Sequence, residues 1–498
     1  MTRVFRTVAG LGCWRQSLDS IGFVPTMGAL HRGHRSLIER ALAENRTVIV
    51  SIFVNPLQFA PGEDFDRYPR NWAADLALCE ELGVSAVFAP DRSEVLPSFK
   101  IVPPPEMVKG LCAPFRPGHF EGVCTIVMQL LQIVRPDRVY LGQKDGQQVA
   151  ILEKLIGDFH LPVELVRCPT LREESGLAYS SRNRYLSPGE YQMAGAIYQA
   201  LVLAKTEFQK GERCSAKLVG VVENFLQTVP EIKIEYIECV HFQTLTPLEI
   251  IMDGTVAMVA IAGYVGNTRL IDNLILQNRR PILAIDGPAG AGKSTVAKRV
   301  AAKLGLLYLD TGAMYRGITW AVLEAQIALD DWGAIVELAS SLRVSLTPDA
   351  RVFVNDHNVT DLIRQHHITE SVSKVAAIPQ VREIMLREQR SLGKGGGVVM
   401  EGRDIGTNVF PDAEVKIFLT ASALERAKRR QQDLKERQLE VPSLESIQKS
   451  IQERDYRDMN RPVAPLRQAE DAILLNTDGL TIEEVVDRIV AYCNARFS

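Results

Sequence analysis

The chain has 498 residues, of which 46% are hydrophobic and 23% are charged, and its formal net charge is −3. This composition is typical of a folded globular protein and excludes a disordered or fibrous one, and the length predicts two to four domains because single cores rarely exceed about 250–300 residues. The residues before Pro281 carry 29 Lys and Arg against 30 Asp and Glu, and the rest carry 28 against 30, so neither half has the excess positive charge of a nucleic-acid-binding domain.

The first part of the chain alternates short β-branched runs with helix-like stretches. This rhythm predicts an α/β fold with a parallel sheet covered by helices. The proline-rich segment 102–107 is predicted to be a loop between units. The expected strands are residues 21–25, 47–54, 85–90, 138–142 and 162–168, and the expected helices are residues 34–44, 72–82, 124–134 and 147–159.

The pattern changes after residue 186. Helix-like stretches at 191–208 and 216–227 precede two strand-like runs at 232–242 and 255–265, which predicts a small α+β subdomain ending near Asn273. Residues 274–280 are predicted to be a short junction without a Gly/Ser linker. We therefore expect a first domain at residues 1–276, made of a Rossmann-like ATP-binding part (1–186) and the α+β subdomain (187–276).

A second domain is expected at residues 277–498. An apolar strand from Pro281, a glycine-rich loop and a helix at 293–304 open it, and the runs LLYLD, RVSL, RVFV, VVMEGRD and VKIFLT supply further strands. The last helix is expected to begin near Thr481, because Thr481 and Glu484 have the spacing of a capping box.

The loop VPTMGALHRGH joins an expected strand to an expected helix. Its glycines allow close approach of a ligand, and the helix start offers unpaired N–H groups to an anion. His31 and His34 can point at one phosphate group, although the same pair could bind a metal or be structural. Polar runs after later strands (FVNPLQF, LGQKDGQQ and YSSRN) favour the phosphate site, because the carboxyl ends of parallel strands meet in one crevice.

These runs, together with RPGHFEGV, resemble the pantothenate synthetase family across roughly residues 1–275. The resemblance implies a HIGH-type nucleotidyltransferase fold and the ATP-driven condensation of pantoate with β-alanine through enzyme-bound pantoyl adenylate. His34 would be the proton donor, with His31 beside it on the phosphates and Lys144 reaching the α-phosphate. Gln58 and Gln148 would hold pantoate, and Gln58 would also touch the β-alanine side.

The same resemblance implies a set of residues that bind ATP in the first domain. They are Met27, Gly28, Ala29, Leu30, His31, Arg32, Gly33, His34, Gly142, Gln143, Lys144, Asp145, Leu171, Tyr179, Ser180, Ser181 and Arg182.

The segment GPAGAGKST satisfies G-x-x-x-x-G-K-[ST] between a strand and a helix, which is the context of a Walker A loop. Its N–H groups would cradle phosphates, Lys293 would reach the β- and γ-phosphates, and Ser294 would bind Mg²⁺. The loop alone fits a GTPase, an ATPase motor or a small-molecule kinase. The expected ATP-binding residues are Gly287, Pro288, Ala289, Gly290, Ala291, Gly292, Lys293, Ser294 and Thr295.

Arginines beside aspartates recur in the second half, and guanidinium groups suit a monophosphate and the charge of phosphoryl transfer. The motifs LDTGAMYRG, EGRDIGTNVFPDA and ERDYRDMNRPVAPL resemble the cytidylate kinase family over about residues 280–498. The resemblance implies a P-loop nucleoside monophosphate kinase that uses ATP to phosphorylate CMP or dCMP. Arg403 and Asp404 are candidate catalytic residues, Asp404 as an acceptor-orienting carboxylate. The expected acceptor-binding residues are Asp310, Thr311, Arg316, Arg382, Arg403, Asp404, Arg454, Asp458 and Arg461.

The leading hypothesis is a bifunctional enzyme that uses ATP at both sites and Mg²⁺ in the second. The alternatives are a single active site and a P-loop half that acts as a nucleotide-sensing module. The expected partners are pantoate, β-alanine, CMP or dCMP, and ATP, without nucleic acid or membrane, and the synthetase resemblance implies a homodimer through the first half. Since no C-x-x-C pair, signal-peptide core or run of about 18 apolar residues occurs, we expect neither structural zinc nor disulfides, and a cytoplasmic protein.

Overall fold

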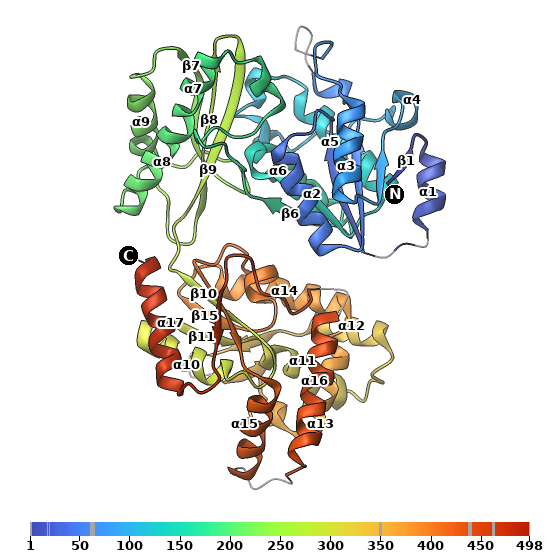
Figure 1. Cartoon of the computed structure of the whole chain (residues 1–498), viewed down its shortest axis with the longest axis vertical. Helices are drawn as coiled ribbons and strands as arrows, with labels where there is room; N and C mark the ends of the chain where they lie inside the picture. Colours follow the sequence, from blue (N-terminus) through green and yellow to red (C-terminus); the bar gives the residue numbers. More distant parts are fainter. Residues whose placement is uncertain are drawn as a thin grey trace. The chain divides into compact units, whose positions relative to one another are not determined.

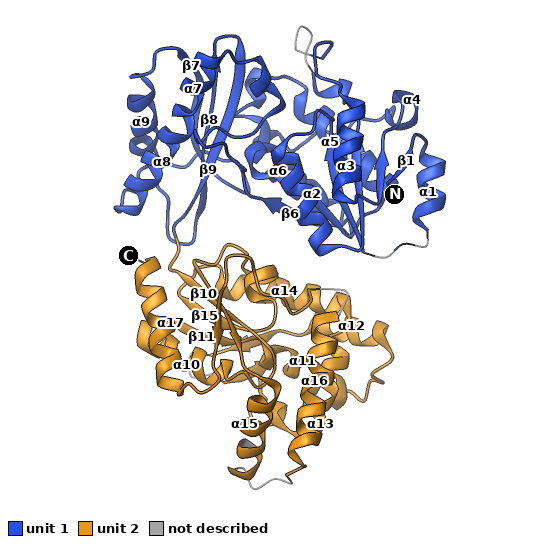
Figure 2. Cartoon of the chain, in the orientation of Figure 1, with its two compact units in different colours: residues 1–278 blue, residues 279–498 orange. Residues whose placement is uncertain are grey.

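The structure is a computed structural model that describes residues 2–16, 18, 20–59, 65–347, 351–436, 441–460 and 464–497. The chain divides into two compact units, residues 1–278 and 279–498 (Figure 2). Each unit has its own sheets and its own hydrophobic clusters, so each can be built from its own segment of sequence.

The first unit contains a six-stranded parallel sheet, in the order β1-β4-β3-β2-β5-β6. Its edge strands β1 and β6 are labelled in Figure 1. All of its neighbouring pairs are parallel, so the predicted parallel sheet is confirmed. Its strands are β1 (Arg3–Phe5), β2 (Ile21–Thr26), β3 (Thr47–Ile52), β4 (Ala86–Phe88), β5 (Arg138–Gly142) and β6 (Glu164–Cys168).

Helices cover both faces of this sheet. Buried residues of α2 and α3 pack on one face with Val48 and Val50, and those of α1, α5 and α6 pack on the other with Phe23 and Ile49. The helices are α1 (Val8–Arg15), α2 (Arg32–Glu44), α3 (Trp72–Leu82), α4 (Arg92–Val95), α5 (His119–Val134) and α6 (Gly146–Asp158). The proline-rich segment predicted as a loop contains a 3₁₀ turn, Pro105–Val108, which needs no N–H from its first proline.

The order of the strands reverses at β2. The chain passes from β2 to β3 on one side, whereas β5 pairs with β2 on the other side. The loops that follow β2 and β5 therefore open side by side at the carboxyl edge of the sheet. This is the position at which open α/β sheets bind their ligands.

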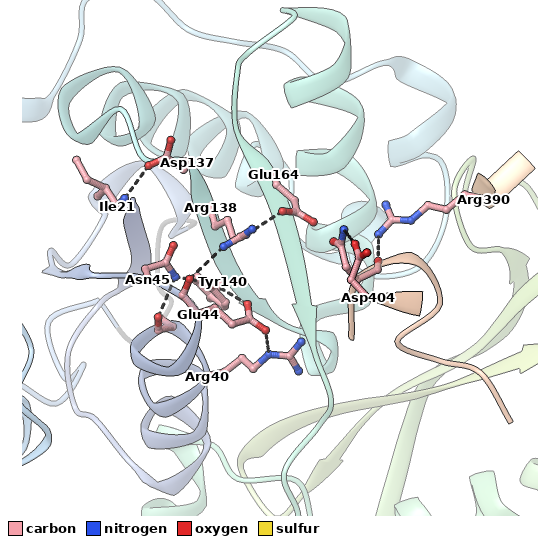
Figure 3. A network of polar contacts seen from close by, with 12 residues as sticks. Ile21, Arg40, Glu44, Asn45, Asp137, Arg138, Tyr140, Glu164, Arg390 and Asp404 are labelled. Carbon is pink, nitrogen blue, oxygen red and sulfur yellow. Dashed lines mark hydrogen bonds and ion pairs between the residues drawn. The ribbon is translucent and has the colours of Figure 1, made fainter. Parts of the chain in front are cut away.

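A polar network fixes the far end of α2 against β5 (Figure 3). The buried Tyr140 hydroxyl donates to Glu44 Oε2 at 2.8 Å and accepts from Asn45 Nδ2 at 2.7 Å. Arg138 donates to the Glu44 carbonyl oxygen at 3.2 Å and to the Glu164 carboxylate at 2.9 Å. The network joins the helix after β2 to β5 and β6, so it sets the angle at which α2 leaves the sheet edge.

An antiparallel sheet of β7 (Ile232–His241), β8 (Val256–Val265) and β9 (Thr268–Gln277) follows, covered by α7 (Pro188–Ala194), α8 (Ala196–Gln209) and α9 (Ser215–Leu226). The prediction of a junction at residues 274–280 was wrong for Leu274–Gln277. These residues complete β9, and Gln277 is still paired with Val256. The error arose because a two-strand pattern hid the third strand, whose polar Asp272 and Asn273 interrupt its apolar run.

The second unit contains a five-stranded parallel sheet, in the order β11-β15-β10-β16-β17, and a small antiparallel sheet, β12-β13-β14. Thr481 and Glu484 form the predicted capping box, with backbone N–H bonds in both directions. The strands are β10 (Ile282–Asp286), β11 (Leu307–Asp310), β12 (Val344–Leu346), β13 (Val352–Val354), β14 (His357–Asn358), β15 (Val398–Glu401), β16 (Val415–Thr420) and β17 (Ile473–Asn476). The helices are α10 (Lys293–Leu304), α11 (Thr311–Glu324), α12 (Trp332–Ser341), α13 (His366–Val375), α14 (Pro379–Gly393), α15 (Ala423–Glu436), α16 (Leu444–Asn460) and α17 (Ile482–Phe497).

The Tyr140 network gives a stability prediction. Tyr140→Phe removes two hydrogen bonds, one of them to the Glu44 carboxylate, while Glu44 keeps Arg40 and Asn45 keeps the Ala41 carbonyl oxygen, so we expect a loss of about 1–3 kcal/mol in the unfolding free energy of the first unit. Urea unfolding of the full chain measures it. Tyr191→Phe, which removes the hydroxyl of a half-buried tyrosine outside the network, is the control, and an equal effect of both changes would contradict the prediction.

Candidate active sites

The loop that follows β2 is shaped by a buried carboxylate from another helix. Asp75 of α3 is 3% exposed and accepts the N–H of Ala29 at 2.8 Å and of Leu30 at 2.7 Å. These two bonds hold Ala29 in the left-handed region, at φ 50°. Burial raises the pKa of Asp75 although the two N–H groups act against it. Sequence reasoning missed Asp75, because nothing near it in the chain marks it as a partner of this loop.

His31 and His34 lie together at the start of α2, with ring centroids 4.1 Å apart. His31 precedes the helix, and its Nδ1 accepts the N–H of Gly33 at 3.1 Å. In the neutral ring this bond places the hydrogen on Nε2, which becomes a donor. The Nδ1 atom of His34 is buried and has no hydrogen-bond partner among the residues that the structure describes.

Both histidines are neutral near pH 7. Burial lowers the pKa of His31 to about 2, and the nearby His34 and Lys144 act in the same direction. Burial also lowers the pKa of His34 to about 4, with Asp145 raising it and Lys144 lowering it. The electrostatic influence of Lys144 on both rings shows that the loop after β5 lies beside the loop after β2.

The loop after β5 is held by the small antiparallel sheet. Asn273 of β9 donates from Nδ2 to the carbonyl oxygens of Gln143 and Lys144, each at 2.9 Å, and accepts from Gln143 Nε2 at 3.1 Å. Arg172 binds the neighbouring Asp272 with both terminal nitrogens, at 2.5 and 2.9 Å. Asn273 was also missed, since it lies in the segment that was predicted to end the domain.

A third loop, after β6, reaches the same place. The Tyr179 ring is stacked on that of His31 with centroids 6.4 Å apart, and the Tyr179 N–H donates to the Leu171 carbonyl oxygen. Ser180 accepts the N–H of Arg182, and the Ser181 hydroxyl is 3.5 Å from the hydroxyl of Tyr68. The structure therefore brings the predicted residues of three separate loops together around the histidine pair.

Gln58 and Gln148 approach this region from two sides. Gln58 Nε2 is 3.0 Å from the Met27 sulfur, and its side-chain oxygen accepts from buried Asn55. The backbone oxygen of Gln58 is 2.7 Å from His119 Nδ1. Gln148 lines a small cavity of about 40 Å³ with Lys144, Asp145, Arg116 and His119. Asn55 and His119 lie in the sequence motifs FVNPLQF and RPGHFEGV but were not assigned a role.

The glycine-rich loop of the second unit follows β10. Gly287, Gly290 and Gly292 have positive φ angles of 147°, 78° and 86°. Lys293 begins α10, is 6% exposed, and donates to the Pro288 carbonyl oxygen at 2.8 Å. Burial lowers the pKa of Lys293, and the nearby Arg403 lowers it further. The loop has the conformation of a phosphate cradle, with its lysine folded onto the loop itself.

Two carboxylates at the ends of β10 and β15 were missed by sequence reasoning. Asp286 accepts the N–H groups of Ile405 at 2.8 Å and Gly406 at 2.7 Å, and burial raises its pKa to about 6. Glu401 is 4% exposed and is bonded to Ser294 and Tyr308. Burial raises the pKa of Glu401, and the nearby Asp310 adds to this shift.

The predicted arginines of the second unit lie in partly neutralised pairs. Arg316 is 2.9 Å from Asp310, Arg403 is 3.0 Å from Asp458, and Arg382 is 2.8 Å from Asp404. Thr311 donates to the Glu401 carbonyl oxygen at 2.7 Å. Arg461 lies outside the described residues.

Arg454 has no such close ion pair among the described residues, although Asp458 acts on it electrostatically. Its Nε atom is buried without a hydrogen-bond partner in the described part of the chain, as are those of Arg316 and Arg382. Burial lowers the pKa of Arg454 and the nearby Arg403 lowers it further, whereas Asp458 raises it. Arg316 also lowers it, so Arg316, Arg403 and Arg454 converge on one region beside Lys293. Such a cluster of cations is suited to a polyanion.

A cavity of about 310 Å³ adjoins this cluster. It is lined by Ser294 and Thr295 of α10, by Asp310, by Arg316, and by Leu346 and Val352 of the small sheet. Its volume is in the range of small-molecule sites. Within the described ranges, no three His, Cys, Asp or Glu side chains gather as metal ligands, and no helix is long and apolar enough to cross a membrane.

Two family models match the chain. The model described as pantoate-beta-alanine ligase matches residues 3–275, and the model described as cytidylate kinase matches residues 283–495.

Relatives match the whole chain. A protein of Trichormus variabilis named bifunctional pantoate ligase/cytidylate kinase is 52% identical, covering 100% of this chain and 99% of that protein. A protein of Synechococcus elongatus with the same name is 51% identical, covering 96% and 93%. The crystal structure of pantothenate synthetase from Thermus thermophilus is 44% identical with a TM-score of 0.52, covering 55% of this chain and 99% of that chain.

The lowered pKa values of the two histidines predict a pH dependence of stability. Below about pH 6.5 the unfolded chain takes up protons that the folded chain binds only near pH 4 or lower, so folding stability falls as the pH falls through this window. We expect the Tm of the first unit to decrease between about pH 7 and pH 4, and to decrease less steeply in His34→Asn. Calorimetry at several pH values measures this.

The exposed His160 provides the control for that experiment. His160→Asn removes an exposed imidazole ring outside the site, and we expect it to keep the pH dependence of the original chain. If His34→Asn and His160→Asn gave the same slope of Tm against pH, the burial of His34 would not be the cause.

Proposed function

The chain belongs to the pantoate–β-alanine ligase family over its first unit and to the cytidylate kinase family over its second, and on this basis we propose which residues carry the two reactions. The protein is a bifunctional enzyme. One reaction condenses pantoate with β-alanine at the expense of ATP, giving pantothenate, AMP and diphosphate. The other transfers a phosphoryl group from ATP to CMP or dCMP. Relatives named for both activities do not favour a single active site with a sensing module.

We propose that the paired histidines at the start of α2 bind the triphosphate in the ligase reaction. The observation that carries this assignment is the meeting of His31, His34 and Lys144 at the edge where β2 and β5 adjoin. His31 offers its Nε2–H to a phosphate oxygen. A bound polyanion raises the pKa of a neighbouring imidazole, so His34 gains a proton when ATP arrives and becomes a donor to the leaving diphosphate.

Attack of the pantoate carboxylate on the α-phosphorus builds negative charge. This charge is stabilised by Lys144, Arg182 and the N–H groups of α2. Gln58 and Gln148 hold pantoate, and the amine of β-alanine then attacks the acyl carbon and releases AMP. Asp75 and Asn273 act through the loops they hold and touch no substrate in this scheme. The further ATP-binding residues are those named from the family resemblance, Met27 to His34, Gly142 to Asp145, Leu171 and Tyr179 to Arg182.

In the second unit, Gly287 to Thr295 bind ATP, and the converging Arg316, Arg403 and Arg454 hold the phosphates between donor and acceptor. Thr311, Arg382, Asp404 and Asp458 are assigned to the cytidine side. In-line transfer needs positioning and charge neutralisation more than a strong base, which fits a site with more arginines than free carboxylates. Arg461 completes the proposed acceptor set on family resemblance alone.

The donor set next to the glycine-rich loop fits Mg²⁺. The Ser294 hydroxyl is bonded to Glu401, and Asp310 lies close enough to raise the pKa of Glu401, so hydroxyl and carboxylate oxygens gather where a hard cation prefers them. Ser294 would bind the ion directly, and Glu401 would orient its water ligands. When bound, Mg²⁺ neutralises the phosphate oxygens of ATP.

We also propose a homodimer through the first unit and a cytoplasmic location, on the resemblance to the synthetase family. Light scattering of the full chain tests the dimer, and a mass of one chain of 55.3 kDa would exclude it.

Separate sites predict separable activities. His34→Asn is expected to lower pantothenate formation at least about a hundredfold and to leave CMP phosphorylation within about twofold, and Lys293→Ala is expected to do the reverse. Parallel assays of AMP release with pantoate and β-alanine, and of ADP release with CMP, measure both activities on the same preparation. Loss of both activities in either variant would contradict independent sites.

The Mg²⁺ assignment has its own test. Glu401→Gln is expected to raise the Mg²⁺ concentration for half-maximal CMP phosphorylation about tenfold, because residues that orient a metal's ligands contribute about 10–100-fold in affinity. Titration of the kinase rate with Mg²⁺ measures it. Glu337→Gln, an exposed acid of α12, is the control, and an unchanged titration in Glu401→Gln would remove Glu401 from the metal site.

A further inference from the structure

Arg426 of α15 is a buried cation that the proposed reaction does not use. It is 5% exposed, although it begins a basic stretch on a helix whose other described residues, apart from Ala427, are half-buried or exposed. Nε donates to the Ala421 carbonyl oxygen at 3.1 Å, NH1 to the Ala289 carbonyl oxygen at 3.0 Å, and NH2 to Asp455 at 2.6 Å. One guanidinium therefore joins the start of α15, the glycine-rich loop and α16.

The contact with the glycine-rich loop is close. Ala289 stands between Pro288, whose carbonyl oxygen accepts from Lys293, and Gly290. A side chain at position 290 would place its Cβ only 3.3 Å from the Cβ of Arg426. The first turn of α15 thus lies against the loop itself, and Arg426 fixes the orientation of the peptide group that precedes Gly290.

The contact with α16 is an ion pair with little solvent. Asp455 is 8% exposed, and its Oδ1 has no hydrogen-bond partner among the described residues. Arg426 is therefore the main group that offsets the cost of burying the Asp455 charge. Removal of this partner from a buried carboxylate is strongly destabilising. The pair sets the rotation of α16 about its own axis.

That rotation matters because α16 supplies two groups to the phosphate region. Arg454 and Asp458 are four residues apart and lie on one face of the helix, next to Asp455 in the sequence. Asp458 is 3.0 Å from Arg403, and the buried Nε of Arg454 lies on the same face of the helix, one turn before Asp458. A small rotation of α16 about its axis would move both groups away from the glycine-rich loop.

We infer that Arg426 is a positioning residue for phosphoryl transfer, which holds the glycine-rich loop and α16 in one geometry so that Lys293 and Arg454 meet the same phosphates. The inference rests on the proposed kinase function of the second unit. It differs from a direct contact between Arg426 and nucleotide, because the effect passes through Asp455 and reaches the acceptor side as well as the ATP side.

Two substitutions in the full chain test this link. Asp455→Asn removes the ion pair but leaves the bonds of Arg426 to Ala421 and Ala289, so we expect kcat for CMP to fall about tenfold and KM for CMP to rise severalfold, with KM for ATP within about twofold. Arg426→Lys cannot reach all three acceptors, and we expect it to lower kcat at least as much and to raise KM for ATP as well. The double variant should be no worse than Arg426→Lys alone, because both changes break one unit.

Asp471→Asn is the control, since Asp471 pairs with Lys416, another buried cation of the same unit, at 2.8 Å, with its carboxylate more exposed than that of Asp455. It should lower Tm without changing kcat or either KM. Pantothenate formation should stay unchanged in all variants. If Asp455→Asn lowered Tm and left the kinetics unchanged, the ion pair would have only a structural role. If Arg426→Lys raised KM for ATP while Asp455→Asn had normal kinetics, Arg426 would contact the nucleotide directly. Either outcome overturns the inference, whereas absence of CMP phosphorylation in the unchanged chain would instead overturn the kinase function.

Discussion

Groups that bind phosphate must be held close together and partly buried before the phosphate binds. Their desolvation and mutual repulsion cost free energy, and this electrostatic cost determines much of the surrounding structure. In the second unit this cost appears as lowered pKa values, because burial and the mutual proximity of cations lower the pKa of both Lys293 and Arg454. Partner acids offset part of the cost, as Asp458 does for Arg403 and Asp404 does for Arg382. The first unit reduces the same cost differently, since His31 and His34 stay neutral.

Both units hold the loops of these sites with the same device, a buried aspartate that accepts two successive backbone N–H groups. Asp75 accepts from Ala29 and Leu30, and Asp286 accepts from Ile405 and Gly406. In each case burial raises the pKa of the carboxyl group and the two N–H groups oppose that rise. Both carboxylates are buried, so water competes little with these bonds and each carboxylate fixes the backbone segment that it binds.

The amino-acid pattern predicted the parts of the structure that are local in sequence. The parallel sheets, the helix at residues 72–82 and the capping box at Thr481 follow from periodicity and end signals, and the motifs place His31, Lys144 and Lys293 at strand ends. The third antiparallel strand was missed because its buried Asp272 and Asn273 resemble a loop in a single sequence, whereas in the structure they bind Arg172 and the loop after β5. Asp75 and Glu401 were missed for the same reason, since their partners are distant in the chain and no local spacing of residues indicates the contacts.

In the proposed scheme the two sites rely on different donors because the two reactions move charge differently. When the α-phosphorus is attacked, a diphosphate leaves with new negative charge, and a neutral imidazole that takes up a proton as the polyanion binds can return it to the leaving group. Transfer of the γ-phosphoryl group to a monophosphate passes through a transition state whose charge is spread over oxygens and needs no net proton gain from the protein, so guanidinium groups that never lose their charge are the better fit. The choice between histidine and arginine therefore follows from which end of the triphosphate each site opens to its nucleophile.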